Sequence, residues 1–150
     1  MLGTVHRSKS QFQEAEACYS ELQNRLDASD PKYRETEEGR RRIAEVVIQL
    51  GRIALARGRQ KLAEEKFGEA CVLLRTLTSD YALNPAYTLD LADCLYHRSQ
   101  LARKDDKAQA AKFLEEATKI MEGLVVRSPK NENYISILDN YLAALKEVDK

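Results

Sequence analysis

Residues that interrupt helices are scarce in this chain. The 150 residues include three prolines, six glycines and no tryptophan, whereas a β-sandwich or barrel needs a turn about every 8–12 residues. No apolar stretch approaches the roughly 20 residues that a membrane-spanning helix requires, and no positively charged and then apolar signal segment opens the sequence. These absences argue against an all-β fold and against a membrane partner, and they predict a soluble, all-α protein.

An excess of charge of either sign is also missing. Lys and Arg together number 24, and so do Asp and Glu, which argues against attraction of the whole surface to nucleic acid or to an anionic membrane. The three cysteines, Cys18, Cys71 and Cys94, are odd in number and widely spaced, so they do not suggest a disulfide framework and they fit a reducing, cytoplasmic location. We expect one domain spanning residues 1–150.

The side-chain groups that catalysis or cofactor binding needs do not occur together in the sequence. There is no glycine-rich phosphate-binding loop. Cys94 and His97 lie three residues apart on one predicted helix, but two ligands do not make a zinc site. We interpret all three cysteines as packed apolar residues and His97 as facing solvent or a binding groove. The sequence therefore predicts no catalytic residues, no metal site and no cofactor, and a protein that is not an enzyme.

Each proline follows a residue that is typical of a helix N-cap, in the pairs Asp30-Pro31, Asn84-Pro85 and Ser128-Pro129. Asp, Asn and Ser side chains accept a hydrogen bond from a free amide of the first turn, and proline at the first helical position loses no hydrogen bond. All three pairs therefore predict helix starts. Between them, apolar residues recur at steps of three and four, as in helices that face a core.

Shorter polar breaks predict tight turns between antiparallel helices. These breaks are Ser8-Lys9-Ser10, Gly58-Arg59 and Lys104-Asp105-Asp106. The polar segment 35–42 is either a loop or the exposed first part of a long helix, and Gly39 favours a kink or break there. We therefore predict helices over residues 1–7, 11–28, 33–57, 60–79, 86–103, 107–126 and 131–148.

A set of apolar residues recurs along the chain at a nearly constant distance. Each set consists of a small residue, a large residue and a third apolar residue. Steps of four and then three residues place all three on one face of a helix. The sets are Ala15, Tyr19 and Leu22; Ala63, Phe67 and Ala70, which lie 48 residues later; and Ala110, Leu114 and Ala117, which lie 47 residues after those. Leu2-Gly3 likewise returns as Leu50-Gly51, and Tyr87, Leu91 and Leu95 return as Tyr134, Leu138 and Leu142.

The recurring sets have a physical explanation in a helical hairpin. Gly51, Ala63 and Ala70 are small enough to let two helices approach closely, and the ring of Phe67 fills the space toward the next hairpin. One such hairpin cannot bury both of its faces, so copies are expected to stack side by side.

Leu50-Gly51, Ala63, Phe67 and Ala70 stand at the offsets of the tetratricopeptide-repeat signature, so the chain resembles this family over nearly its whole length. The usual period of the family is about 34 residues, so a period of 47–48 implies longer helices or joints. Repeats lengthened in this way, with a Pro-x-Tyr helix start and a Gly-Arg hairpin turn, resemble those appended to bacterial serine/threonine protein kinases. The resemblance implies a right-handed α-solenoid of stacked antiparallel hairpins, with about seven helices.

The resemblance divides the chain into a partial repeat over 1–30, a repeat over 31–80, a repeat over 84–127 and a terminal helix over 131–148. In the later repeat, Leu50-Gly51 aligns either with His97-Arg98 or with Arg98-Ser99. We prefer the second alignment, because Ser99 is small enough for close helix contact. Leu2-Gly3, at the start of the sequence, belongs in the middle of a first helix, and the helix over 131–148 has no partner following it. We therefore expect a segment of a longer array; the alternative is that the last helix serves as a cap.

In this family the first helix of each repeat lines the concave face, which implies a partner-binding groove. The exposed positions that this rule selects carry charges of both signs, an aromatic ring and aliphatic groups, which suits a peptide or helix of a partner protein. They are Thr4, Arg7, Glu45, Ile48, Gln49, Arg52, Leu55, Asp93, Tyr96, His97, Gln100 and Arg103. Ile48 and Arg52 replace the Lys and Asn that clamp a carboxylate in some members. The alternative is that some of these residues pack against the helix of the next repeat.

Three functions are considered for such an array. The first is a non-catalytic protein–protein interaction scaffold. The second is a structural segment that self-associates through exposed repeat ends, where Phe12 and Tyr19 lack a covering neighbour. The third is RNA binding through the basic run 40–42, but Glu residues in the segment 35–38 balance those charges and no aromatic residues alternate with them, which argues against a nucleic-acid partner.

Overall fold

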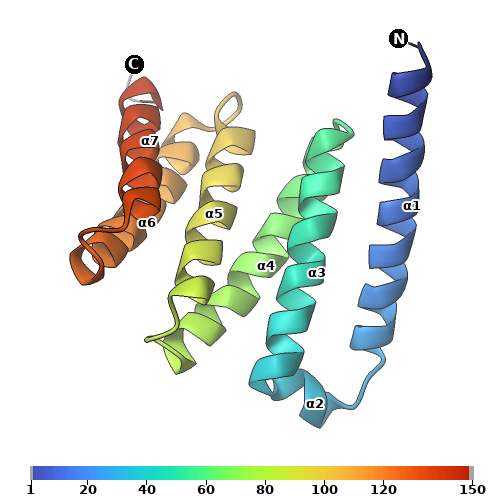
Figure 1. The fold of residues 1–150 in the computed structure, drawn as a ribbon. Helices are drawn as coiled ribbons and strands as arrows, with labels where there is room; N and C mark the ends of the chain where they lie inside the picture. Colours follow the sequence, from blue (N-terminus) through green and yellow to red (C-terminus); the bar gives the residue numbers. More distant parts are fainter. Residues whose placement is uncertain (1, 149–150) are drawn as a thin grey trace. The chain divides into compact units, whose positions relative to one another are not determined.

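Over residues 2–148 the chain folds into helices joined by turns. The computed structural model describes the backbone of residues 2–148 and the side chains of residues 9–148, and within residues 2–148 it contains seven helices and no strand (Figure 1). The helices are α1 (Leu2–Asp27), α2 (Pro31–Glu35), α3 (Glu37–Ala56), α4 (Gln60–Asp80), α5 (Pro85–Ala102), α6 (Lys107–Arg127) and α7 (Glu132–Val148). The predicted fold class, all-α with antiparallel helical hairpins, is confirmed.

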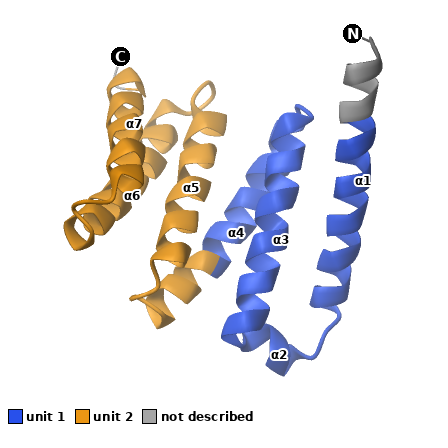
Figure 2. Cartoon of the chain, viewed as in Figure 1, with its two compact units in different colours: residues 1–73 blue, residues 74–150 orange. Residues whose placement is uncertain are grey.

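The helices form two compact units, Met1–Leu73 and Leu74–Lys150, and the boundary falls inside α4 (Figure 2). Unit 1 contains α1, α2, α3 and the first part of α4. Unit 2 contains the rest of α4 together with α5, α6 and α7. The division into repeats over residues 1–150 stays a prediction.

In unit 1 a tight turn joins α3 to α4. Gly58 has a φ of 74°, a left-handed conformation that glycine adopts without steric cost, and the amide of Arg59 donates to the carbonyl of Ala54 at 2.8 Å. The turn predicted at Gly58-Arg59 is therefore confirmed. At the close contact inside this hairpin, a Cβ atom at Gly51 would lie 3.0 Å from the ring of Phe67.

Helix α1 packs along α3, and polar side chains of α1 bind the hairpin at its turn and along the first half of α4. Glu16 forms ion pairs with Arg57 and Arg59 beside the turn. Two helical turns further along α1, the side-chain amide of Gln23 donates to Glu69 at 3.0 Å and accepts from Lys66 at 2.9 Å. Gln23 is buried, but both polar atoms of its side chain form hydrogen bonds, so no unpaired polar group is buried with it.

Helix α1 is one helix of 26 residues, so the turn predicted at Ser8-Lys9-Ser10 is wrong, and residues 1–7 and 11–28 do not form a hairpin of their own. Lys and Ser are tolerated inside a helix, unlike Gly or Pro, and Lys9 and Ser10 are exposed. The polar segment therefore interrupts the apolar stripe of the helix without ending the helix.

The single helix predicted over 33–57 is also wrong, because the chain breaks at Thr36. The Thr36 hydroxyl accepts from the amide of Gly39 at 3.0 Å as the N-cap of α3, and it donates to the carbonyl of Tyr33 at 2.6 Å. Gly39 lies in α3 rather than at the break. A Cβ atom there would lie 2.1 Å from the carbonyl oxygen of Tyr33, so this glycine permits the close approach of α2 to α3.

In unit 2 helices α5 and α6 form a second hairpin, and α7 packs on α6 (Figure 1). Asn84 caps α5 by accepting from the amide of Ala86 at 3.0 Å, and Asp106 caps α6 by accepting from Gln109 at 3.0 Å. The helix start predicted at Asn84-Pro85 and the turn predicted at Lys104-Asp105-Asp106 are both confirmed. In unit 1, Asp30 likewise caps α2 as predicted.

The helix start predicted at Ser128-Pro129 is wrong. Ser128 is the C-cap of α6, and α7 begins at Glu132. The capping side chain is Asn131, which accepts from the amide of Tyr134 at 3.1 Å. Pro129 lies in the turn that follows α6, a position where proline is common because it cannot continue a helix.

The recurring sets form much of the core of both units. Ala63, Phe67 and Ala70 are fully buried, as are Ala110, Leu114 and Ala117. The first set differs, because Ala15 and Tyr19 are half-buried and Leu22 is exposed. Ser99, which we aligned with Gly51, is buried, and its hydroxyl donates to the carbonyl of Tyr96 at 2.6 Å.

Cys71 and Cys94 are buried as predicted, but Cys18 is exposed and its predicted core position is wrong. The inward side of α1 follows Ala15, Tyr19 and Gln23. Cys18 immediately precedes Tyr19, and neighbouring residues on a helix differ by about 100° in direction.

Replacing Gly51 with alanine is expected to destabilise the protein. The added methyl group would lie 3.0–3.2 Å from the Phe67 ring, and that ring is fully buried and cannot move into solvent. Overpacking of this kind costs about 1–3 kcal/mol, more than the roughly 1 kcal/mol that alanine gains over glycine in a helix. Urea unfolding followed by circular dichroism measures the change.

Gly123 provides the matched control, because it also lies inside a helix but a Cβ atom there would meet no heavy atom within 4 Å. We expect Gly123→Ala to raise the free energy of unfolding by about 0.5–1 kcal/mol. If both substitutions stabilise the protein equally, the close contact between Gly51 and Phe67 is not a constraint on the fold.

Candidate functional site

The predicted groove residues of unit 1 lie along α3. Glu45, Arg52 and Leu55 are exposed and Gln49 is half-buried, so these four are accessible to a partner. Glu45 forms an ion pair with Arg41 at 2.9 Å on the same helix. Thr4 and Arg7, also predicted for the groove, lie outside the residues whose side chains the structure describes.

Ile48 was predicted to be exposed, and this is wrong: its relative exposure is 5%. Helix α3 contacts α1, α2 and the ring of Phe67 on α4, so a wide arc of its surface is buried. Val47 and Gly51 lie in this arc and Ile48 falls within it as well. The apolar run Val46-Val47-Ile48 was the signal in the sequence, since all three residues are buried.

The predicted groove residues of unit 2 lie on α5, except Arg103, which is the C-cap of that helix. Two of them contact aromatic or acidic neighbours. The ring of Tyr96 stacks on Tyr141 of α7, with centroids 4.9 Å apart and planes at 14°. His97 meets the ring of Tyr96 edge-on, and its Nε2 atom lies 3.5 Å from Oδ1 of Asp93. Gln100 is half-buried. Tyr96 therefore packs partly against a neighbouring helix, which is the alternative interpretation of the groove.

Burial raises the pKa of the Tyr141 phenol well above its ordinary value, and the nearby carboxylate of Asp93 raises it further. Tyr96 and Cys94 contribute in the same direction. The phenol of Tyr141 therefore stays protonated and neutral in the folded protein at physiological pH.

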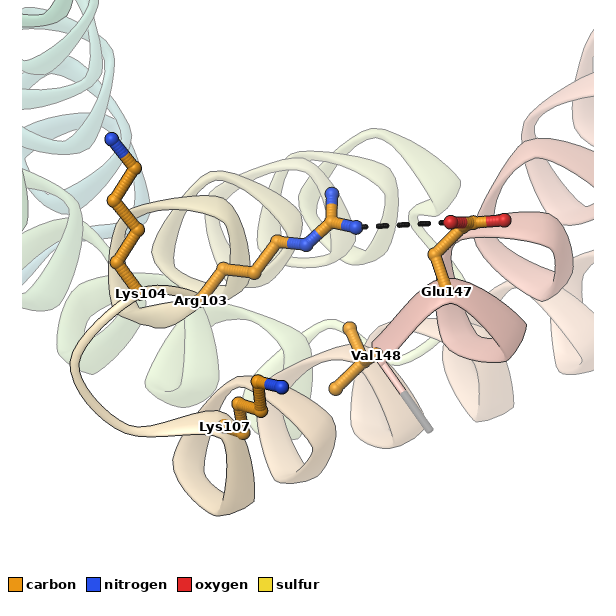
Figure 3. Close-up of a pocket in the computed structure, with 5 residues that line it drawn as sticks. All are labelled: Arg103, Lys104, Lys107, Glu147 and Val148. Carbon is orange, nitrogen blue, oxygen red and sulfur yellow. Dashed lines mark ion pairs between the residues drawn. The ribbon is translucent and has the colours of Figure 1, made fainter. Parts of the chain in front are cut away.

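The turn between α5 and α6 and the end of α7 enclose an open pocket of about 460 Å³ (Figure 3). Its lining consists of Arg103, Lys104, Lys107, Glu147 and Val148. The guanidinium of Arg103 faces the carboxylate of Glu147 at 4.0 Å, and the two side chains are 45% and 57% exposed. An ion pair this open to solvent is weak.

The sequence had assigned only Arg103 of these five residues to a binding surface. Lys104 and Lys107 were visible in the sequence as a charged turn, but there Asp105 and Asp106 balance them. Glu147 and Val148 reach the pocket because α7 packs on α6, and helical periodicity does not encode this contact between segments far apart in the chain.

The remaining chemistry of the described residues is sparse. Among residues 9–148 no group of three or more His, Cys, Asp or Glu side chains is arranged to hold a metal ion. Cys94 on α5 is fully buried and packs as a small apolar residue. None of the helices in the described part of the chain combines the length and the apolar character that crossing a membrane would need.

Comparisons with known proteins show a likeness in fold. No family model matches the sequence, and no curated protein sequence matches it either. A solved structure of the yeast histone chaperone Hif1, described as a scaffold protein recruiting protein complexes to core histones, superposes with a TM-score of 0.75 at 19% sequence identity. The match covers 93% of this chain and 56% of that one, so this chain spans about half the length of the yeast protein's chain.

Replacing Tyr141 with phenylalanine is expected to make stability less sensitive to alkaline pH. The unfolded phenol ionises near its ordinary pKa of 10.0, whereas the folded phenol ionises only at higher pH. The folded state therefore holds its proton more tightly, so this contribution to stability is fully present below pH 10 and is lost as the pH rises further. Urea midpoints between about pH 8 and about pH 11 should fall more steeply for wild type than for Tyr141→Phe; parallel curves would contradict the assignment.

Proposed function

We propose that this chain is a non-catalytic, cytoplasmic scaffold of the tetratricopeptide-repeat type, which binds a peptide or helix of a partner protein on the first helices of its hairpins. The observation that carries the proposal is the burial of the recurring small and large residues in both units, with polar residues left accessible on α3 and α5. A fold arranged in this way uses its apolar side chains for its own packing and offers polar and mixed surfaces to partners.

The comparison supports the same class of function. The yeast protein of similar fold is described as a scaffold protein, and its described role is the precedent for this chain. Because sequence identity is low, our proposal extends to a protein or peptide partner and not to the partners of the yeast protein.

Reversing the charge of Arg52, or adding a negative charge at Gln100, is expected to abolish partner binding. Immobilised wild type should retain a protein that Arg52→Glu on α3, or Gln100→Glu on α5, fails to retain. With that protein purified, calorimetry should show a loss of affinity of about tenfold or more, because an added like charge in an interface costs several kcal/mol.

The controls for this experiment are Lys61→Glu and Lys119→Glu, exposed positions on α4 and α6. Both change the net charge by as much as Arg52→Glu does, but they lie on the second helices of the hairpins. If the control variants lose the partner as readily, or if the α3 and α5 variants keep it, the groove assignment is wrong.

Exposed apolar side chains on the first and last helices support a second candidate function, self-association. Phe12 and Leu22 are exposed on α1, and Ile135 and Leu142 are exposed on α7. Ile135 and Leu142 lie seven residues apart and therefore on one face of α7, and a second chain that covered this face would bury both.

If the ends self-associate, the mass of the wild-type protein in sedimentation equilibrium should rise with concentration. Leu142→Asp should then stay monomeric, because burying an unpaired carboxylate is costly. Val126→Asp, at an exposed apolar residue on α6, is the control and should behave as wild type. A wild-type monomer at every concentration would exclude this second function.

A further inference from the structure

We propose that the pocket at the α5–α6 turn binds a carboxylate group of an acidic peptide segment, with an aliphatic side chain of that segment against Val148. This inference deepens the proposed scaffold function by naming the chemistry of the partner at one position. It rests on five residues that line a single cavity: Arg103, Lys104, Lys107, Glu147 and Val148.

The pocket is positively charged. Three of its five lining side chains are cations and one is a carboxylate. Among residues 9–148, neither Lys104 nor Lys107 has an ion-pair partner. Asp106, in the same turn, does not line the pocket, and its carboxylate is held by the amide of Gln109 as the cap of α6. Among the five described lining residues, an anion therefore meets three cations and one carboxylate.

Two of the three cations extend toward the end of α7. Figure 3 shows Arg103 and Lys107 both extended toward α7, one toward Glu147 and the other toward Val148, while Lys104 points away from Glu147. Val148 is buried and supplies an apolar wall beside the two cations. The arrangement suits a ligand that carries a carboxylate next to an aliphatic group.

Glu147 indicates which anion the pocket takes. Its carboxylate lies 4.0 Å from Nη2 of Arg103, and both side chains are about half exposed, so a carboxylate already occupies the edge of the site through a weak contact that solvent screens. An incoming carboxylate of similar geometry would replace this contact and would also meet Lys107. Glu147 therefore acts as an internal competitor for the ligand.

If Glu147 competes with the ligand, substitutions of two kinds in this pocket should change the affinity in opposite directions. Removing a cation by Arg103→Gln or Lys107→Gln should weaken binding by about threefold, which is typical of one solvent-exposed ion pair. Removing the competing carboxylate by Glu147→Gln should strengthen binding by about twofold or more for the same reason. If Glu147 had only a structural role, Glu147→Gln would not strengthen binding.

The probe is a blocked tripeptide, leucine-glutamate-leucine, titrated into the full chain and followed by amide chemical shifts. We expect saturable shifts at the five pocket residues and at least about fivefold weaker binding of the leucine-glutamine-leucine peptide, which lacks the charge. The glutamine peptide with a free C-terminus distinguishes a terminal carboxylate from a side-chain carboxylate as the source. Shifts confined to other residues, or equal binding of the charged and uncharged peptides, would overturn the proposal, and so would tighter binding of inorganic phosphate.

Lys119→Gln and Glu132→Gln are the matched controls, since each makes the same charge change on α6 or α7 at an exposed position. Glu132 lies about 22 Å from Glu147 along the helix, beyond the screening length of about 8 Å at physiological salt. Both should bind as wild type, and control effects equal to those of the pocket variants would overturn the proposal.

The scaffold function and the pocket can fail separately. If Arg52→Glu and Gln100→Glu abolish partner binding but the peptide does not bind, the pocket proposal falls and the scaffold function stands. If the peptide saturates the pocket but no partner depends on α3 or α5, the scaffold function falls and the pocket stands.

Discussion

The contact between Gly51 and the ring of Phe67 is the constraint on which the hairpin of unit 1 depends. Glycine inside a helix costs about 1 kcal/mol relative to alanine, so packing must offset this cost. A single methyl group at residue 51 would lie 3.0 Å from the ring, and larger side chains would separate the helices. Unit 2 has buried Ser99 on α5 and buried Leu114 on α6, without a glycine in α5.

This packing determines what each first helix presents outward. The buried arc of α3 is wide because α1, α2 and α4 all contact it, and it therefore includes Ile48 as well as Gly51. On α5, the ring of Tyr96 stacks on Tyr141 of α7, so part of Tyr96 is covered by a neighbouring helix. The surface left for a partner is therefore narrower and more polar than the helical periodicity alone suggests.

Helix caps and turns could be predicted from the sequence where they depend on neighbouring residues alone. The caps at Asp30 and Asn84 and the turn at Gly58 depend on residues within one helical turn, and each was predicted correctly. Predictions failed where two local signals compete. Thr36 ended a helix where Gly39 was expected to break it, and Asn131 capped α7 in place of Ser128. Which signal wins depends on packing that periodicity does not contain.

The candidate site could be predicted only in part, because its residues come from segments far apart in the chain. Arg103 was recognised from its place on α5, but its carboxylate partner Glu147 comes from α7. A charged turn that contains both lysines and aspartates reads as neutral in sequence. It becomes cationic toward the pocket because Asp106 is used as a helix cap while Lys107 extends toward Val148 (Figure 3). Local folding thus separates charges that the composition shows as balanced, and a neutral chain can still present a cationic pocket to an acidic partner.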